Sequence, residues 1–133
     1  MSNKQDSDNP IPLQLLLKKL LYHYESDLYN DAEVLAELIL QKYPNNEFTL
    51  KVLSAIFKKT YRLDKALLVN IKSININPND EEAFYNLANT FKSLNQLIKA
   101  EINYKKAIAI NPSYAVAYNN LSSTLKDMGR LDE

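Results

Sequence analysis

Two residue types recur at a fixed interval of 34 positions along this chain. The prolines of the series are Pro44, Pro78 and Pro112, and twelve residues before each of them stand the alanines Ala32, Ala66 and Ala100. A repeat of this length is typical of a solenoid, in which near-identical helical hairpins stack side by side. Because such a stack presents a curved surface and seldom a catalytic cleft, the period favours a binding function over a catalytic one.

The composition excludes several classes of function. Sixteen Lys and Arg residues balance sixteen Asp and Glu residues, so no overall charge directs the chain toward nucleic acid or an anionic membrane. The chain has no cysteine, and His23 and Gly129 are its only histidine and glycine, so it offers no usual metal spacing and no phosphate-binding loop. We therefore expect no metal, no cofactor and no enzymatic activity.

The N-terminal residues differ from the rest of the chain. Residues 1–11 are polar and partly acidic, unlike a secretory signal, and we expect them to form a disordered tail. The longest apolar cluster, Leu15 to Leu21, is interrupted by Lys18 and Lys19 and is too short to span a bilayer. These features predict a soluble, cytoplasmic protein with one folded unit over residues 12–133.

The hydrophobic pattern predicts helical hairpins without any strand. In the clearest unit, Phe84, Leu87, Ala88 and Phe91 fall at i, i+3, i+4 and i+7, and a second apolar stripe ends before Pro112. The same pattern predicts seven helices at about 12–26, 29–42, 46–60, 63–76, 80–94, 97–110 and 114–128. The first unit fits one residue out of phase, which suggests a one-residue deletion near Ser26 and Asp27.

These positions resemble the tetratricopeptide repeat (TPR) family. The positions of the clearest unit that carry the resemblance are Phe84, Leu87, Ala88, Phe91, Ala100, Tyr104, Ala107 and Pro112. Departures from the family pattern occur at Ile39, Tyr61 and Asn70. The resemblance implies an all-α, right-handed α-solenoid with repeats at about 13–46, 47–80 and 81–114 and a partial repeat at 115–133. Such an array has three hairpins plus one unpaired helix, and we expect the chain to be a fragment of a longer one.

The resemblance also implies that ligands bind the concave face, which the first helix of each hairpin lines. Asn86 and Asn120 are similar to the asparagine ladder of O-linked N-acetylglucosamine transferases, where side-chain amides hold a peptide backbone. Lys58, Lys92 and Lys126 form a lysine column that either attracts acidic ligands or complements the helix dipoles. The predicted peptide-binding residues are Asn86, Asn120, Asn89, Lys92, Lys126, Lys51, Tyr85 and Asn119.

Two functions stay open on this reading. One is a module that binds an extended protein or peptide segment, and the other is a recruiting or assembly arm of a larger glycosyltransferase-like or sulfotransferase-like enzyme. Members of the family that clamp chaperone carboxylates use five polar residues. Here Lys51 and Asn86 fit that set, whereas Ala55, Val116 and Asn120 do not. Neither a nucleic acid nor a membrane is an expected partner.

The end of the sequence carries a further expectation. The last helix lacks a partner helix, so its apolar stripe of Tyr118, Leu121 and Leu125 should be partly uncovered. We therefore expect self-association through this surface.

Overall fold

The computed structural model describes residues 11–130, and within this range the chain is helical with no strand. The expected tail therefore lies almost wholly outside the described residues, as do the last three residues of the chain. The helices are α2 (Leu13–Glu25), α3 (Tyr29–Lys42), α4 (Glu47–Lys59), α5 (Leu63–Ile76), α6 (Glu81–Ser93), α7 (Leu97–Ile110) and α8 (Ala115–Asp127). All seven agree with the prediction to within one residue at each end.

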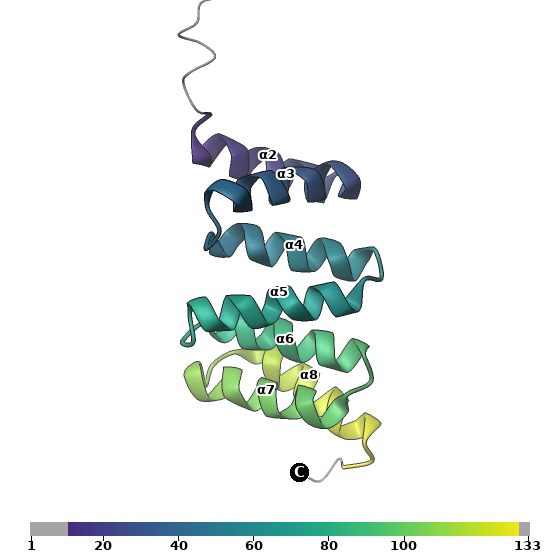
Figure 1. The fold of residues 1–133 in the computed structure, drawn as a ribbon. Coiled ribbons are helices and arrows are strands. Elements are labelled where there is room, and N and C mark those ends of the chain that lie inside the picture. The colour runs from purple at the N-terminus through teal and green to yellow at the C-terminus, as the bar shows by residue number, and fades with distance from the viewer. Residues whose placement is uncertain (1–10, 131–133) are drawn as a thin grey trace, which may run out of the picture.

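The helices form a stack of antiparallel hairpins (Figure 1). The hairpins are α2 with α3, α4 with α5 and α6 with α7, and α8 follows as a single helix in the described chain. Successive helices contact each other, and α2 also contacts α4 while α6 also contacts α8. The first helices of the hairpins therefore share one face of the stack. The predicted all-α solenoid is confirmed.

Two of the first helices, α4 and α6, begin at residues whose side chains cap the helix. The side chain of Asn46 accepts hydrogen bonds from the backbone nitrogen of Thr49 at 2.9 Å and from its hydroxyl at 2.6 Å. Asp80 likewise accepts from the backbone nitrogen of Glu82 at 3.0 Å. Such caps satisfy donors that lack partners at a helix start. They fix the beginnings of α4 and α6, the two helices that carry most of the site described below.

The turn within each repeat contains one residue in the left-handed backbone region. These residues stand 34 positions apart, and they are Asp27, Tyr61, Asn95 and Gly129, with φ between 57° and 73°. The first helices also begin 34 residues apart. The one-residue deletion predicted near Ser26 and Asp27 is therefore wrong. Leu20 is the buried residue of α2 while Leu21 is exposed, so the first repeat is in phase with the others.

Each hairpin has two facing buried positions whose side-chain sizes are complementary. One lies in the first helix and the other in the second, and contact between them is direct in the middle hairpin, where Asn70 donates to Ser54 at 2.7 Å. A large residue at one position is matched by a small one at the other, which keeps the interior densely packed. From the first hairpin to the third, the pairs are Leu20 with Ala36, Ser54 with Asn70, and Ala88 with Tyr104.

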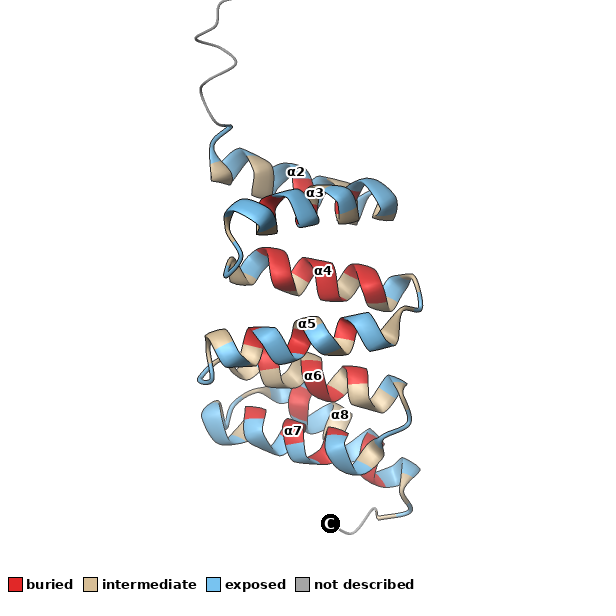
Figure 2. Ribbon diagram, in the orientation of Figure 1, coloured by how far each residue is buried: buried red, intermediate tan, exposed pale blue. Residues whose placement is uncertain are grey.

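Burial is most continuous in α4 and much less so in α2, at the N-terminal end of the stack (Figure 2). At the other end of the stack, Tyr118 is 45% exposed, Leu121 is partly buried and Leu125 is only 7% exposed. The expectation that Leu125 would be partly uncovered is therefore wrong. α8 contacts both α6 and α7.

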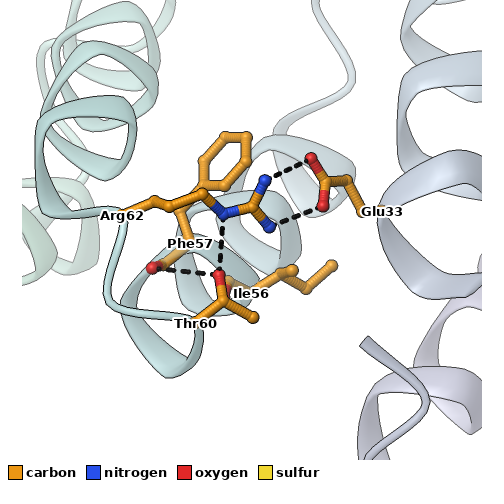
Figure 3. Close-up of polar contacts among 5 residues, drawn as sticks. All are labelled: Glu33, Ile56, Phe57, Thr60 and Arg62. Carbon is orange, nitrogen blue, oxygen red and sulfur yellow. Dashed lines mark hydrogen bonds and ion pairs between the residues drawn. The ribbon is translucent and has the colours of Figure 1, made fainter. Parts of the chain in front are cut away.

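Neighbouring repeats meet at three steps along the stack. At each step a polar contact between side chains, which we call a tie, joins the two repeats. At the first step, Arg62 donates two hydrogen bonds to the carboxylate of Glu33, at 2.8 and 2.5 Å, while its guanidinium lies 4.8 Å from the ring centre of Phe57 (Figure 3). At the third step, Arg130 donates to Glu101 at 2.9 Å. In both pairs the residues are 29 positions apart. The middle step uses another contact, a hydrogen bond of 2.6 Å from the hydroxyl of Thr90 to Asn70.

The pair of Glu33 and Arg62 at the first step should make the stability of the fold depend on pH. Hydrogen bonding from Arg62 lowers the pKa of Glu33 below its usual value, against the opposing effect of burial. A carboxylate with a lowered pKa in the folded state stabilises the fold at neutral pH, and this stabilisation is lost as the pH falls through that pKa.

We expect Glu33→Gln to lower the free energy of unfolding at pH 7 by about 0.5–1 kcal/mol, because the pair is partly exposed. The difference from the wild type should shrink below about pH 4. Urea unfolding across a pH series measures this effect, and the exposed Glu25, changed to Gln, is the control. An unchanged difference between pH 7 and pH 3 would contradict the role given to the carboxylate.

Candidate functional site

Three adjoining hollows form a groove along α2 and α4, which we call the α2–α4 groove. The central hollow encloses about 300 Å³. It shares Leu21 and Phe48 with a hollow of about 150 Å³, and Tyr24, Ala55 and Lys58 with one of about 330 Å³. The residues that line the central hollow are Leu21, Tyr24, Phe48, Lys51, Val52, Ser54, Ala55, Lys58, Glu82 and Asn86. The groove thus lies on the face that the first helices share.

The spacing of residues in α4 explains the shape of the groove. Phe48, Lys51, Ala55 and Lys58 follow each other at intervals of three or four residues, which places them on one side of a helix. The small side chain of Ala55 leaves space between the two lysines. Apolar walls come from the partly exposed Phe48 and, across the groove, from residues of α2. The groove therefore combines an apolar wall with charged groups near each end of α4.

Lys51 is neutralised by acidic residues at the start of α6. Its ammonium lies 2.7 Å from a carboxylate oxygen of Asp80 and 3.5 Å from one of Glu82. Burial tends to lower the pKa of Lys51, but the hydrogen bond to Asp80 and the charges of Glu82 and Asp80 outweigh it, so the pKa is raised. Lys51 was predicted to bind a ligand, and the structure places it in the groove with its charge already paired.

Lys58 differs from Lys51 in lacking a partner. It lies in the last turn of α4, is partly buried and has no carboxylate or hydrogen-bond acceptor among residues 11–130. Burial, reinforced by the positive charge of Lys59, lowers the pKa of Lys58. The groove therefore contains one ammonium group that has given up part of its hydration without gaining an anion.

Asn86 lines the same central hollow from α6. Its backbone carbonyl accepts a hydrogen bond from the hydroxyl of Thr90 at 3.1 Å, whereas its side-chain amide has no partner among the described residues. The amide thus retains both a donor and an acceptor for a ligand. Peptide binding by Asn86 stays a prediction.

Asn120 is placed differently, in a network between α6 and α8. Its side-chain nitrogen donates to the hydroxyl of Tyr85 at 2.9 Å and to the side-chain oxygen of Asn89 at 3.0 Å. Asn89 also accepts a hydrogen bond from the hydroxyl of Tyr104. The structure therefore brings together three of the predicted residues. Because both amide protons of Asn120 are used within the protein, only its oxygen is available to a ligand.

The remaining three predicted residues lie outside both the α2–α4 groove and this network. Lys92 donates to the hydroxyl of Ser123 at 2.8 Å. Lys126 and Asn119 are exposed on α8. Sequence reasoning missed the apolar wall formed by Leu21, Tyr24 and Phe48. Its signal was present in α4, because Phe48 lies outside the buried stripe of that helix and yet is large and apolar.

The sequence also matches a known repeat family. Two family profiles of the tetratricopeptide repeat match, one over residues 81–114 and the other over residues 103–133. With the stack of hairpins, these matches identify tetratricopeptide repeats over residues 81–133. Neither profile describes a catalytic family. A search of curated proteins found no match.

Solved structures share the fold at low sequence identity. A MamA structure is 23% identical with a TM-score of 0.79, over 90% of this chain and 65% of that one. The first TPR domain of Spaghetti (RPAP3), bound to the HSP90 peptide SRMEEVD, is 15% identical with a TM-score of 0.82, over 87% of this chain and 92% of that one. An O-GlcNAc transferase mutant from Thermobaculum terrenum is 20% identical with a TM-score of 0.74, over 88% of this chain and 23% of that one. The chain thus spans about two thirds of that MamA structure and much less of the transferase.

Two further findings concern other ligands and surroundings. Within the described residues, no three His, Cys, Asp or Glu side chains gather in a way that would hold a metal ion. None of the helices α2 to α8 has both the length and the apolar character that crossing a bilayer requires.

Proposed function

We propose that this chain is a protein-interaction module that binds an extended segment of a partner protein in the α2–α4 groove. The observation that carries this proposal is the groove itself, in which the unpaired amide of Asn86 faces the same hollow as the apolar Leu21 and Phe48. An extended peptide needs a backbone donor and acceptor satisfied and gains affinity from buried apolar side chains. A repeat domain of the same fold, that of RPAP3, holds a peptide. The module would be cytoplasmic and non-catalytic.

The alternative of a recruiting arm of a larger enzyme stays a prediction. The similarity to the transferase is one of fold alone, and no residue of the groove favours the arm over a free-standing module. Both alternatives use the same binding surface, so the experiment that follows tests what they share.

Removing the amide of Asn86 tests the proposed function. We expect Asn86→Ala to weaken groove-binding peptides, selected from a random display library, by about 1–3 kcal/mol, which is about 5- to 150-fold. Asn120→Ala should cost less, because its amide protons are already used inside the protein. The exposed Asn119, changed to Ala, is the matched control. Fluorescence anisotropy gives the affinities.

The hypothesis that asparagine amides hold the ligand backbone requires a further result from the same experiment. If amides hold the ligand backbone, Asn86→Ala must weaken peptides of unrelated sequence alike while thermal unfolding stays unchanged. Peptides that bind equally well to the wild type and to Asn86→Ala would show that the groove does not hold a backbone through this residue.

A further inference from the structure

Charges are distributed unevenly along the α2–α4 groove. At the beginning of α4, Lys51 is paired with Asp80 and Glu82, and Lys18 lines the adjoining hollow, so the charges at that end balance. In the last turn of α4, Lys58 has no anion and lies beside a second cation, Lys59. One end of the groove is therefore neutral and the other is positive, although a lysine of α4 stands at each.

From this asymmetry we infer that the partner segment presents a carboxylate to Lys58 and an apolar side chain to the wall of Leu21, Tyr24 and Phe48. The inference rests on the proposed function and deepens it by naming the ligand class and its direction in the groove. Lys58 is not one of the five positions that chaperone-clamping members use. The acidic segment is thus recognised through a different residue.

The physical reason lies in the hydration of Lys58. A partly buried ammonium without an anion has lost solvation, and a carboxylate that reaches it restores that loss through a charge-assisted hydrogen bond. Lys126, at the equivalent position of α8, is exposed and keeps more of its hydration, so an anion there gains little. The lysine column is therefore expected to act at one member rather than evenly.

The spacing along α4 sets the pattern of the ligand. Lys51 and Lys58 are seven residues apart, which corresponds to about 10 Å along a helix. An extended peptide advances about 3.3 Å per residue, so about three residues separate the two ends. A carboxylate at the Lys51 end would meet the charges of Asp80 and Glu82. We therefore expect an acidic residue at the Lys58 end and a neutral or basic residue three positions away.

Lys58→Met tests the inference, since it removes the charge and keeps an unbranched side chain. The probe is the tightest peptide from the display library, in its selected form and with its acidic residue changed to the amide. We expect Lys58→Met to weaken the acidic peptide by about tenfold or more and to leave the amide form unchanged. Lys126→Met is the matched control and should change binding by less than about twofold. Lys58→Arg, which keeps the charge, should retain binding.

The outcomes separate this inference from the proposed function. If binding requires Phe48, as tested with Phe48→Ser, but is equal in the wild type and Lys58→Met, the inference is overturned and the groove function stands. If binding requires neither Phe48 nor Asn86, both are overturned. Amidating the peptide's C-terminus shows whether the carboxylate is terminal or belongs to a side chain. Circular dichroism melts of each variant establish that the fold is intact.

Discussion

Tyr104→Ala is expected to lower the free energy of unfolding by about 3–5 kcal/mol, the largest effect of any single change considered for this chain. Tyr104 is fully buried and is the largest such side chain in the structure. Its neighbours Ala88 and Ala100 are too small to fill the space that the ring would leave. The hydrogen bond from its hydroxyl to Asn89 is lost as well.

Urea unfolding followed by circular dichroism measures this loss. Tyr118→Ala removes the same side chain from an exposed position on α8 and should cost less than about 1 kcal/mol. Tyr104→Phe keeps the ring and removes the hydroxyl, and we expect a cost of about 0.5–1.5 kcal/mol. Equal stability of Tyr104→Ala and Tyr118→Ala would show that the third hairpin is not packed around this ring.

The second large effect is expected for Asn70→Ala, at about 2–4 kcal/mol. Asn70 is 2% exposed, and its amide bonds to the hydroxyls of Ser54 at 2.7 Å and Thr90 at 2.6 Å. Alanine would leave a cavity and would remove the partner of the Ser54 hydroxyl. Thr90 would keep only its bond to the backbone carbonyl of Asn86.

Because the sizes of the two facing side chains are complementary, a second substitution should restore part of the stability that Asn70→Ala loses. Ser54→Leu combined with Asn70→Ala copies the pair of Leu20 and Ala36 in the first hairpin, so the leucine should fill the cavity and remove the unpaired hydroxyl. We expect the double variant to be more stable than Asn70→Ala by about 1–2 kcal/mol. A double variant less stable than either single one would mean that the two positions do not share one space. Equilibrium unfolding of the four proteins in the cycle decides this.

The sequence predicted the helices well because hydrophobic spacing and proline are local signals. It failed in the first repeat, where leucines at consecutive positions support two helical phases. The equivalent positions of the next two repeats hold the small residues Ser54 and Ala88. Leu20 fills that place because Ala36 opposite it is small, and such a match between two helices is a property of the pair.

The candidate site was predictable only in part for a similar reason. Asn86 was found because it recurs as Asn120 one period later, and Lys51 because it stands at a position that chaperone-clamping members use. Both line the groove. The pairing of Lys51 with Asp80 joins two helices, as do the bonds of Asn120, so the free or occupied state of each side chain depends on the fold. The ties of Glu33 with Arg62 and Glu101 with Arg130 skip the middle step, which hides their 29-residue spacing from a search for a common repeat.

The ties between hairpins also determine where the solenoid responds to its medium. The middle step combines the buried bond between Asn70 and Thr90 with the partly exposed ion pair of Lys51 and Asp80. The first step depends on the partly exposed pair of Glu33 and Arg62, whose attraction weakens as ionic strength rises. This first step joins the hairpin of α2 to the hairpin of α4, the two helices along which the groove runs. The central hollow is lined by α2, α4 and α6, so it crosses both of these steps. A rise in ionic strength should therefore weaken ion pairs on both sides of the groove, while the buried bond between Asn70 and Thr90 is affected less.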